Sequence, residues 1–340
     1  MLLPLIDAGV LRMPRDMINI RDARGWRSEM EAGGYRGVVV GTSDSESGRE
    51  VESATRSGAA LARLPVIAFE DFPGNFRHQD DAGETTLVVE SEQAGRIAKD
   101  RLGGNCPRML VFPPVRYDSQ RTRLRELRER TRAAWACMAL SPPPVLWAGQ
   151  PETGECLRTL DALLPALRGE GAVLLFKAHP RDRGYPSAYA HLFDKPDGRV
   201  RDVTSLDVDA VMALGPRLVV TQFSSVAVEA GFHGVPAMNV LLPEAGGSLL
   251  LTKKGYRIPP WCSAGAAYVA VEEPGMPAML HEALRDDLGR ERIISRFDRY
   301  FSASSVVLPR LVRMLEDFPT MGGMATVTAV SGDSDNAQAR

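Results

Sequence analysis

The chain has 340 residues, of which 44% are hydrophobic, and its formal net charge at pH 7 is −2. This length predicts two domains with a hydrophobic core in each, and the near-neutral charge argues against nucleic acid as a partner. The four cysteines form no CxxC pair, which argues against a zinc site and a disulfide scaffold, so we expect reduced thiols in a cytoplasmic protein.

The N-terminal segment MLLPLIDAGVLRM lacks a basic region before its apolar run and carries Asp7 within it, which argues against a signal peptide. No apolar run in the chain reaches the ~20 residues that a membrane helix needs. The stretch LLPLIDAGV has the pattern of a helix, and we expect the first helix here.

Helices and strands alternate from Trp26 to Val115, which predicts an α/β domain. Two acids, Glu70 and Asp71, follow the second of these strands. One interpretation is a catalytic base and the other is a solvated acidic loop. The expected strands are RGVVVG, PVIAF, ETTLVVES and RMLVFPPV, and the expected helices span residues 26–32, 49–64 and 93–101.

Seven arginines lie between residues 116 and 132, most of them in a segment expected to be helical, residues 118–136. Its apolar residues follow helical spacing, and Glu126 and Glu129 offset part of the charge. The simplest interpretation is a solvated amphipathic helix that links two domains. The alternative is a cationic face toward an anionic membrane surface or an acceptor glycan.

The proline-rich run SPPP at residues 141–144 is a stiff linker and marks the predicted domain boundary. We predict an N-terminal domain over residues 1–140, a C-terminal domain over 141–318 and a flexible tail over 319–340, which lacks periodicity and aromatic residues. In the C-terminal domain, strands are expected at VLWAGQP and over 172–176, 217–221, 236–242 and 266–272, and helices over 157–167, 226–233, 279–284 and 292–318.

Basic residues follow the strand at 172–176, at the edge where open α/β sheets bind ligands. Lys177, His179 and Arg181 alternate along FKAHPRDRG, and Pro180 forces an extended or turn conformation on the histidine. A histidine between two cations suits phosphate binding, or proton donation to a leaving phosphate oxygen. The alternative is a loop histidine with solvated neighbours.

A second polar junction, with Gln222, Ser224 and Ser225, follows the strand at 217–221 and precedes a short helix. The first N–H groups of a helix have no internal partner and favour an anion. Two small serines leave room for a phosphate and add hydroxyl donors, although either could serve only as the N-cap. Glu229 lies too far from Ser225 for a capping box, so it either accepts hydrogen bonds from ribose hydroxyls or is a solvated glutamate.

The two junctions together carry a family resemblance. KAHP followed by TQFSSVAVEAGFHGVPAM resembles the nucleotide-binding half of GT-B fold glycosyltransferases, in the capsule and lipopolysaccharide group with HP and Ser-Ser motifs. Bacterial sialyltransferases, Kdo transferases and CDP-glycerol glycerophosphotransferases share variants of these motifs. The resemblance covers residues 145–318 and implies two Rossmann-like domains facing across a cleft. His179 and the serine pair would then hold the phosphates of a nucleotide-activated donor, with Glu229 at the ribose.

The resemblance also implies a carboxylate base on the acceptor domain, as an inverting transferase requires. In the sialyltransferase branch this base lies in an acidic motif that ends in glycine, which EDFPG resembles loosely. We therefore predict Asp71 or Glu70 as the base and His179 as the group acting on the leaving phosphate. No DxD motif stands at a strand end, so we expect no metal and no cofactor besides the donor substrate; Lys177, the serines and the helix dipole would stabilise the leaving group.

The start of the chain departs from this family pattern. A GT-B N-terminal domain opens with a buried strand and a glycine-containing loop, whereas LLPLIDAGV has the pattern of a helix. Three interpretations stay open: the domain lacks its first strand, the true start lies upstream, or this opening is itself a strand.

The predicted function is metal-independent transfer of a sugar or polyol phosphate from a nucleotide-activated donor. The acceptor would be a cell-surface glycan or a small molecule, in the cytoplasm or at the inner face of the membrane. One alternative is an enzyme like UDP-N-acetylglucosamine 2-epimerase, from whose glycine-rich signature TQFSSVAVEAG departs. The other is a non-catalytic protein of this fold that binds a nucleotide sugar or a partner. The sequence does not distinguish between oligomeric states.

Overall fold

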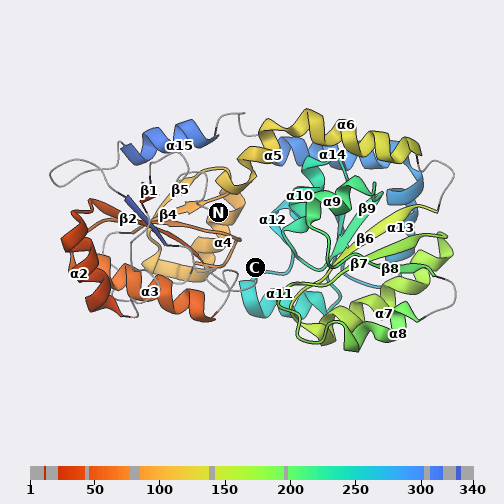
Figure 1. Cartoon of the computed structure of the whole chain (residues 1–340), viewed down its shortest axis with the longest axis horizontal. Coiled ribbons are helices and arrows are strands. Elements are labelled where there is room, and N and C mark those ends of the chain that lie inside the picture. The colour runs from red at the N-terminus through yellow and green to blue at the C-terminus, as the bar shows by residue number, and fades with distance from the viewer. Residues whose placement is uncertain are drawn as a thin grey trace. The chain divides into compact units, whose positions relative to one another are not determined.

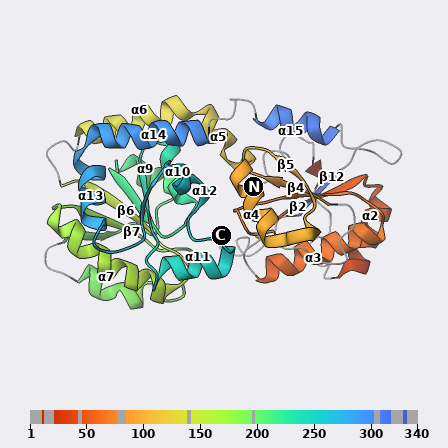
Figure 2. The same cartoon turned by 180° about the vertical axis from the view of Figure 1, so that it is seen from behind.

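A computed structural model describes residues 11–12, 22–42, 46–76, 85–137, 142–194, 198–301, 307–316 and 327–330. These residues belong to two compact units, which we describe one at a time: unit 1 holds Met1–Asp118 and Ser304–Arg340, and unit 2 holds Ser119–Ala303. Each unit contains a parallel β-sheet with helices on it, as Figure 1 and Figure 2 show from two sides. The predicted α/β class with two Rossmann-like domains is confirmed.

The described strands of unit 1 form a sheet in the order β1-β12-β2-β3-β4-β5, and every neighbouring pair is parallel. Strands of a sheet that is covered on both faces have near-continuous apolar sequences, which is why GVVVG and VIAF are buried along their whole length. The elements are β1 Leu11–Arg12, α2 Ala23–Gly33, β2 Gly37–Gly41, α3 Glu46–Leu61, β3 Val66–Phe69, β4 Thr85–Val89, α4 Glu92–Leu102, η1 Gly103–Asn105, β5 Arg108–Val111, η2 Val115–Tyr117, α15 Val307–Glu316 and β12 Val327–Val330.

Helices α2 and α3 of unit 1 pack closely because small residues line their contact. A Cβ added at Gly58 would lie 2.5 Å from the Cβ of Trp26, so only glycine fits there. Ala59 is fully buried in the same core. Helix α3 therefore meets α2 through small residues, with Gly58 as the closest point of the contact.

Unit 1 also includes segments from the end of the chain, and here the structure differs from the sequence prediction. The predicted long helix over 292–318 is divided into α14 (Asp287–Phe301) in unit 2 and α15 in unit 1, where Leu311 and Leu315 are buried. Val327–Val330, inside the predicted tail, forms β12 between β1 and β2. The helix expected at LLPLIDAGV lies outside the described residues, and the short strand β1 follows it.

The described strands of unit 2 form a second parallel sheet in the order β11-β10-β9-β6-β7-β8. The elements are α5 Asp118–Thr122, which begins at the boundary, α6 Leu124–Cys137, β6 Pro144–Ala148, α7 Thr153–Gly169, β7 Val173–Lys177, η3 Ser187–Tyr189, α8 Ala190–Phe193, β8 Val200–Asp202, α9 Val208–Ala213, β9 Leu218–Thr221, α10 Val226–Phe232, β10 Ala237–Val240, α11 Gly246–Lys254, α12 Pro260–Ser263, β11 Tyr268–Ala270, α13 Met276–Arg285 and α14.

Successive side chains of each strand in this sheet point to opposite faces, and both faces are covered. On β6, Val145 and Trp147 pack with helices α7 and α13, whereas Leu146 and Ala148 pack with α9 and α10. All four side chains are buried. Among the helices in the described ranges, none is long and apolar enough to cross a membrane.

The arginine-rich helix α6 belongs to unit 2, so the two units divide the chain after Asp118 and not at the predicted boundary of residue 141. The guanidinium of Arg128 donates to both carboxylate oxygens of Asp298 on α14, at 2.9 and 2.6 Å. Trp135 Nε1 donates to the carbonyl oxygen of Pro216 (3.1 Å). The helix is therefore a packed part of unit 2 and not a solvated linker (Figure 1).

Helix α10 packs against α14 through a glycine, and we expect Gly231→Ala to destabilise the protein by about 1–3 kcal/mol through overpacking. An alanine Cβ would lie 2.2 to 2.5 Å from ring carbons of Phe297, a buried side chain. Urea denaturation measures the change. Gly154→Ala, in a helix turn with nothing within 4 Å of the new Cβ, is the matched control. Equal stability of the two variants would contradict the prediction.

Candidate functional site

The predicted phosphate-binding loops lie on both sides of one strand of unit 2. From β6, the chain order runs outward through β7 and β8 on one side and through β9, β10 and β11 on the other. The HP loop follows β7 and the Ser-Ser loop follows β9, and both strands pair with β6. Ligands of open α/β sheets bind at the carboxyl edge where the strand order reverses. The structure thus brings the two predicted junctions to one such edge.

The HP motif forms a tight turn that fixes the histidine ring. Asp182 N donates to the carbonyl oxygen of His179 (2.9 Å), with Pro180 at the position of a β-turn that its fixed φ favours. The backbone N–H of Arg181 donates to His179 Nδ1 (3.0 Å). Because Nδ1 accepts, the neutral ring carries its proton on Nε2. The Arg181 side chain itself is exposed.

Asp182 anchors this turn, a role that the sequence analysis missed. Its carboxylate is buried and accepts hydrogen bonds from the Thr153 hydroxyl, from Gly184 N (2.9 Å) and from the Tyr189 hydroxyl (2.6 Å). Burial, and then the hydrogen bond to Asp182, raise the pKa of Tyr189, so its hydroxyl remains a donor. An acid two residues after His-Pro was the available signal.

The amino group of Lys177 contacts backbone carbonyls, which the sequence did not predict. Its amino group donates to the carbonyl oxygens of Thr204 (3.1 Å) and Leu206, so it holds the loop that follows β8. Burial lowers the pKa of this amine. These two hydrogen bonds to carbonyl oxygens account for the orientation of the side chain without a bound phosphate. We therefore assign Lys177 a structural role.

Gln222 is also structural. It is fully buried, and its Nε2 donates to the carbonyl oxygen of Glu155 (2.9 Å) and to the Thr159 hydroxyl (2.8 Å). The backbone carbonyl oxygen of Gln222 accepts a hydrogen bond from Asn239 Nδ2 (2.9 Å). These contacts join the end of β9 to α7 and β10, so Gln222 stabilises the start of the Ser-Ser loop.

The two serines have distinct positions at the start of α10. Ser224 Oγ accepts from Val226 N (3.3 Å), and its own N–H donates to the Thr221 hydroxyl (3.3 Å), so it stabilises the turn into the helix. Ser225 is the N-cap residue, with helical backbone angles, and its hydroxyl makes no capping bond within the described helix. Glu229 is half-buried on the same helix.

The end of β6 completes this edge with a buried residue pair. The N–H of Gln150 donates to Cys156 Sγ (3.2 Å), and the thiol donates to the carbonyl oxygen of Gln150 (3.4 Å). Burial raises the pKa of Cys156 to about 11, so the thiol stays neutral and serves as a donor. Gly149 lies close to the HP loop, since a Cβ there would be in van der Waals contact with His179 N at 3.4 Å.

The two predicted base candidates lie in unit 1, after β3, and they differ in environment. Glu70 is buried and its Oε1 accepts from the N–H groups of Gly74 (2.9 Å) and Phe76 (3.3 Å). It therefore orders the following loop, a structural role that sequence did not indicate. Asp71 is 37% exposed in its side chain and pairs with the Arg116 guanidinium, while its N–H donates to the Thr42 hydroxyl (2.9 Å). Of the two, Asp71 is the accessible carboxylate.

Solved structures share the fold of this chain. No protein-family model matches it, and neither does any curated protein. S. aureus MnaA with UDP is similar at a TM-score of 0.59 and 11% identity, over 88% of this chain and 82% of that one. Anabaena Alr3699/HepE in complex with UDP and glucose gives 0.55 and 15%, over 84% and 79%. The UDP-GlcNAc 2-epimerase from Neisseria meningitidis bound to UDP-GlcNAc gives 0.54 and 12%, over 89% and 84%.

These likenesses define the class of fold. The chain has the two Rossmann-like units of a GT-B-like protein, as the sequence predicted. At sequence identities of 11% to 15%, structural similarity establishes the fold and not the activity. Activity must be argued from the residues at the sheet edge.

Proposed function

We propose that the chain is a glycosyltransferase-like enzyme that binds a nucleotide-activated sugar, or polyol phosphate, at the carboxyl edge of the unit 2 sheet. It would transfer the activated group to a cell-surface glycan or a related acceptor without a metal ion. The observation that carries the proposal is the placement of the His179 turn and the Ser225 hydroxyl after the two strands that flank β6. Three similar solved structures hold UDP or UDP-GlcNAc, which supports a nucleotide ligand.

In this proposal, His179 contacts the diphosphate through Nε2–H, because its Nδ1 already accepts a backbone hydrogen bond. The exposed guanidinium of Arg181 adds positive charge beside it. Charge-assisted hydrogen bonds of this kind stabilise the negative charge that develops on a leaving phosphate. Ser225 adds a hydroxyl donor, and Glu229 would accept from the ribose hydroxyls.

A polyol phosphate would be transferred by attack of an acceptor hydroxyl on its phosphorus, with cleavage of the P–O bond to the nucleotide. With a sugar donor, the acceptor hydroxyl would attack the activated carbon of the donor. The bond from the acceptor oxygen to this carbon forms, the bond from the carbon to the phosphate oxygen breaks, and the nucleotide leaves with the electron pair. Asp71, the accessible carboxylate of unit 1, would take the proton of the attacking hydroxyl.

A 2-epimerase activity is the second candidate, because one of the similar solved structures is a UDP-GlcNAc 2-epimerase. The two candidates differ in their need for an acceptor. Incubation with UDP-GlcNAc alone, followed by proton NMR, would show a new nucleotide sugar if the chain is an epimerase. A transferase would leave the sugar unchanged until an acceptor is added.

Nucleotide binding is the first test of the proposal. We expect one of CMP, CDP, UDP, GDP and ADP to raise the melting temperature without magnesium, since a ligand at 100 times its dissociation constant stabilises by about 2.7 kcal/mol. A shift that appears only with magnesium would contradict metal independence. No shift from any of the five would remove the nucleotide site.

Variants then locate the site. His179→Ala and the double change Ser224→Ala with Ser225→Ala are each expected to weaken nucleotide binding about 10- to 100-fold, as calorimetry would measure, through loss of hydrogen bonds to charged oxygens. His191→Ala, which removes an exposed histidine on α8, is the matched control and should leave affinity unchanged. Unchanged affinity in the first two variants, with normal melting temperatures, would exclude both motifs from the site.

A further inference from the structure

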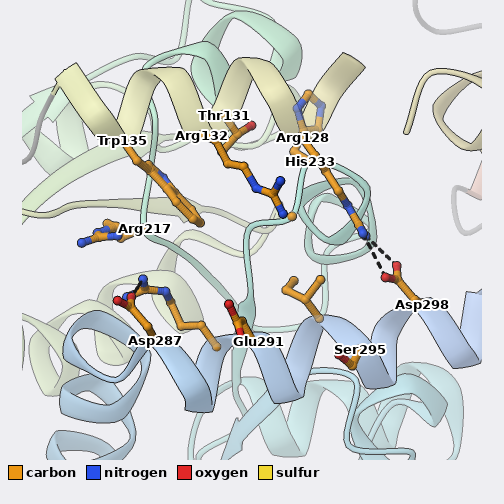
Figure 3. Close-up of a pocket in the computed structure, with 13 residues that line it drawn as sticks. Arg128, Thr131, Arg132, Trp135, Arg217, His233, Asp287, Glu291, Ser295 and Asp298 are labelled. Carbon is orange, nitrogen blue, oxygen red and sulfur yellow. Dashed lines mark hydrogen bonds and ion pairs between the residues drawn. The ribbon is translucent and has the colours of Figure 1, made fainter. Parts of the chain in front are cut away.

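A cavity in unit 2 lies away from the carboxyl edge of the sheet. It has a volume of about 540 Å³ and lies between α6 and α14. Its floor includes Arg217, which precedes β9, and His233, which follows α10, so it is at the amino edge of the sheet. Figure 3 shows Arg132 extending from α6 toward α14 across this cavity. Pockets for small molecules have volumes of ~300–1,000 Å³.

Two of the four arginines around this cavity are paired internally. Arg128 binds Asp298 and also donates to the carbonyl oxygen of Gly231 (3.3 Å). Arg290 binds Asp287 and donates to the carbonyl oxygen of Leu284 (3.4 Å). In each pair the aspartate neutralises its arginine. Figure 3 shows the Arg128–Asp298 pair at one end of the cavity and Asp287 toward the other.

The other two arginines, Arg132 and Arg217, form no ion pair with any residue that the structure describes. Arg217 lies 5.3 Å from the centre of the Trp135 ring and Arg290 lies 5.4 Å from it, so two guanidinium groups contact one indole. Burial, and then the positive charge of Arg290, lower the pKa of Arg217, and the carboxylate of Asp287 offsets only part of this effect. An anion bound between Arg132 and Arg217 would relieve this unfavourable environment.

The opposite wall, on α14, is polar and contributes a negative charge. Glu291 and Ser295 lie one helical turn apart and both line the cavity (Figure 3). His233 is buried, and its Nε2 lies 3.3 Å from Asp209 Oδ1. Burial lowers the pKa of His233, so its ring adds no charge at neutral pH. With the two internal pairs set aside, two positive charges and one negative charge face a ligand. Such a lining suits an anion that also carries hydroxyl groups, which can donate to Glu291.

We propose that this cavity binds a small hydroxylated oxyanion, with Arg132 and Arg217 on its charged group and Glu291 and Ser295 on its hydroxyls. The shared chemistry fits a sugar phosphate or a sugar acid. This site is separate from the proposed nucleotide site, because it lies at the amino edge of the sheet and shares no residue with the HP and Ser-Ser loops.

Tryptophan fluorescence tests the proposal on the full chain, because Trp135 is half-buried whereas Trp26, Trp147 and Trp261 are at most 2% exposed. Glucose 6-phosphate and glucuronate are titrated separately, with glucose as the uncharged control. We expect a saturable signal from at least one anion, lost in Trp135→Phe, and at least about 10-fold weaker binding of glucose. The anion that binds more tightly identifies the charged group as phosphate or carboxylate.

The variants place the ligand. Arg132→Ala and Arg217→Met are each expected to weaken anion binding at least about 10-fold in calorimetry. Arg130→Ala is the matched control, since it removes one positive charge from the opposite face of α6, where Arg130 pairs with Glu126. Arg132 is exposed, so its variant tests the site even where Arg217→Met does not fold. Three results would overturn the proposal: no saturable binding of either anion up to about 10 mM, equal binding of glucose, or affinity unaffected by Arg132→Ala.

Discussion

Asp182→Ala is expected to lower the free energy of unfolding by about 3–5 kcal/mol, because it removes the acceptor of a buried hydrogen-bond cluster. The Thr153 hydroxyl, Gly184 N and the Tyr189 hydroxyl would each lose a partner. The buried Tyr189 ring contacts Phe176 at 4.8 Å between ring centres, so its hydroxyl cannot turn to water without disturbing the core. Urea denaturation of the full chain measures this loss.

Asp182→Asn is the matched variant, since asparagine keeps one oxygen acceptor and the size of the side chain. We expect it to cost about 1 kcal/mol, as for one altered hydrogen bond. Both changes should also weaken nucleotide binding, because the Asp182 carboxylate anchors the turn that holds His179. Equal stability of Asp182→Ala and the unchanged chain would show that the cluster contributes nothing to the fold.

Asp71→Asn is expected to reduce turnover about 100- to 10,000-fold while leaving nucleotide affinity unchanged, the effect of removing a general base. The amide oxygen of asparagine can still accept from Arg116, so the local structure is preserved. It cannot take a proton from the acceptor hydroxyl. The measurement is a transfer assay with the nucleotide sugar selected by the binding screen, together with calorimetry of that nucleotide.

Asp100→Asn, which neutralises an exposed acid on α4 of the same unit, is the control for charge and should keep full turnover. Glu70→Gln has a different expected outcome. Because Glu70 Oε1 accepts from two backbone N–H groups of its own loop, the variant should lower stability before it affects chemistry. Normal turnover in Asp71→Asn would exclude it as the base.

Local sequence patterns predicted most strands and helices of both units, but not β1, β8 or β12. Short Val- and Leu-rich runs bounded by turn residues became β2, β3, β6, β7, β9 and β10, since a parallel sheet buries both faces of each strand. The domain boundary was harder to predict from the sequence. Arg128 and Trp135 attach α6 to unit 2 through Asp298 and Pro216, and partners this distant along the chain leave no local signal.

In the candidate site, too, local sequence predicted only part of the structure. Residue types after β7 and β9 indicated which loops meet at the sheet edge, because the topology of parallel strands determines that edge. Which side chains remain available there depends on tertiary hydrogen bonds. Lys177 and Gln222 look like ligand-binding residues in the sequence, but backbone carbonyls of Thr204 and Glu155 engage them. Asp182, which sequence did not single out, orients the turn.

The interrupted path of the chain has a consequence for synthesis of the protein. The chain leaves unit 1 after Asp118 and returns only at Ser304, where Arg310 of α15 stacks over Phe112 at 5.7 Å from the ring centre. Unit 2 is continuous and can fold as soon as its last helix leaves the ribosome, since domains fold as units during translation. Residues 1–118 must wait for their closing segments, so the buried faces of β2 and β3 are exposed to aggregation and to chaperones until β12, which pairs with β2, has been translated.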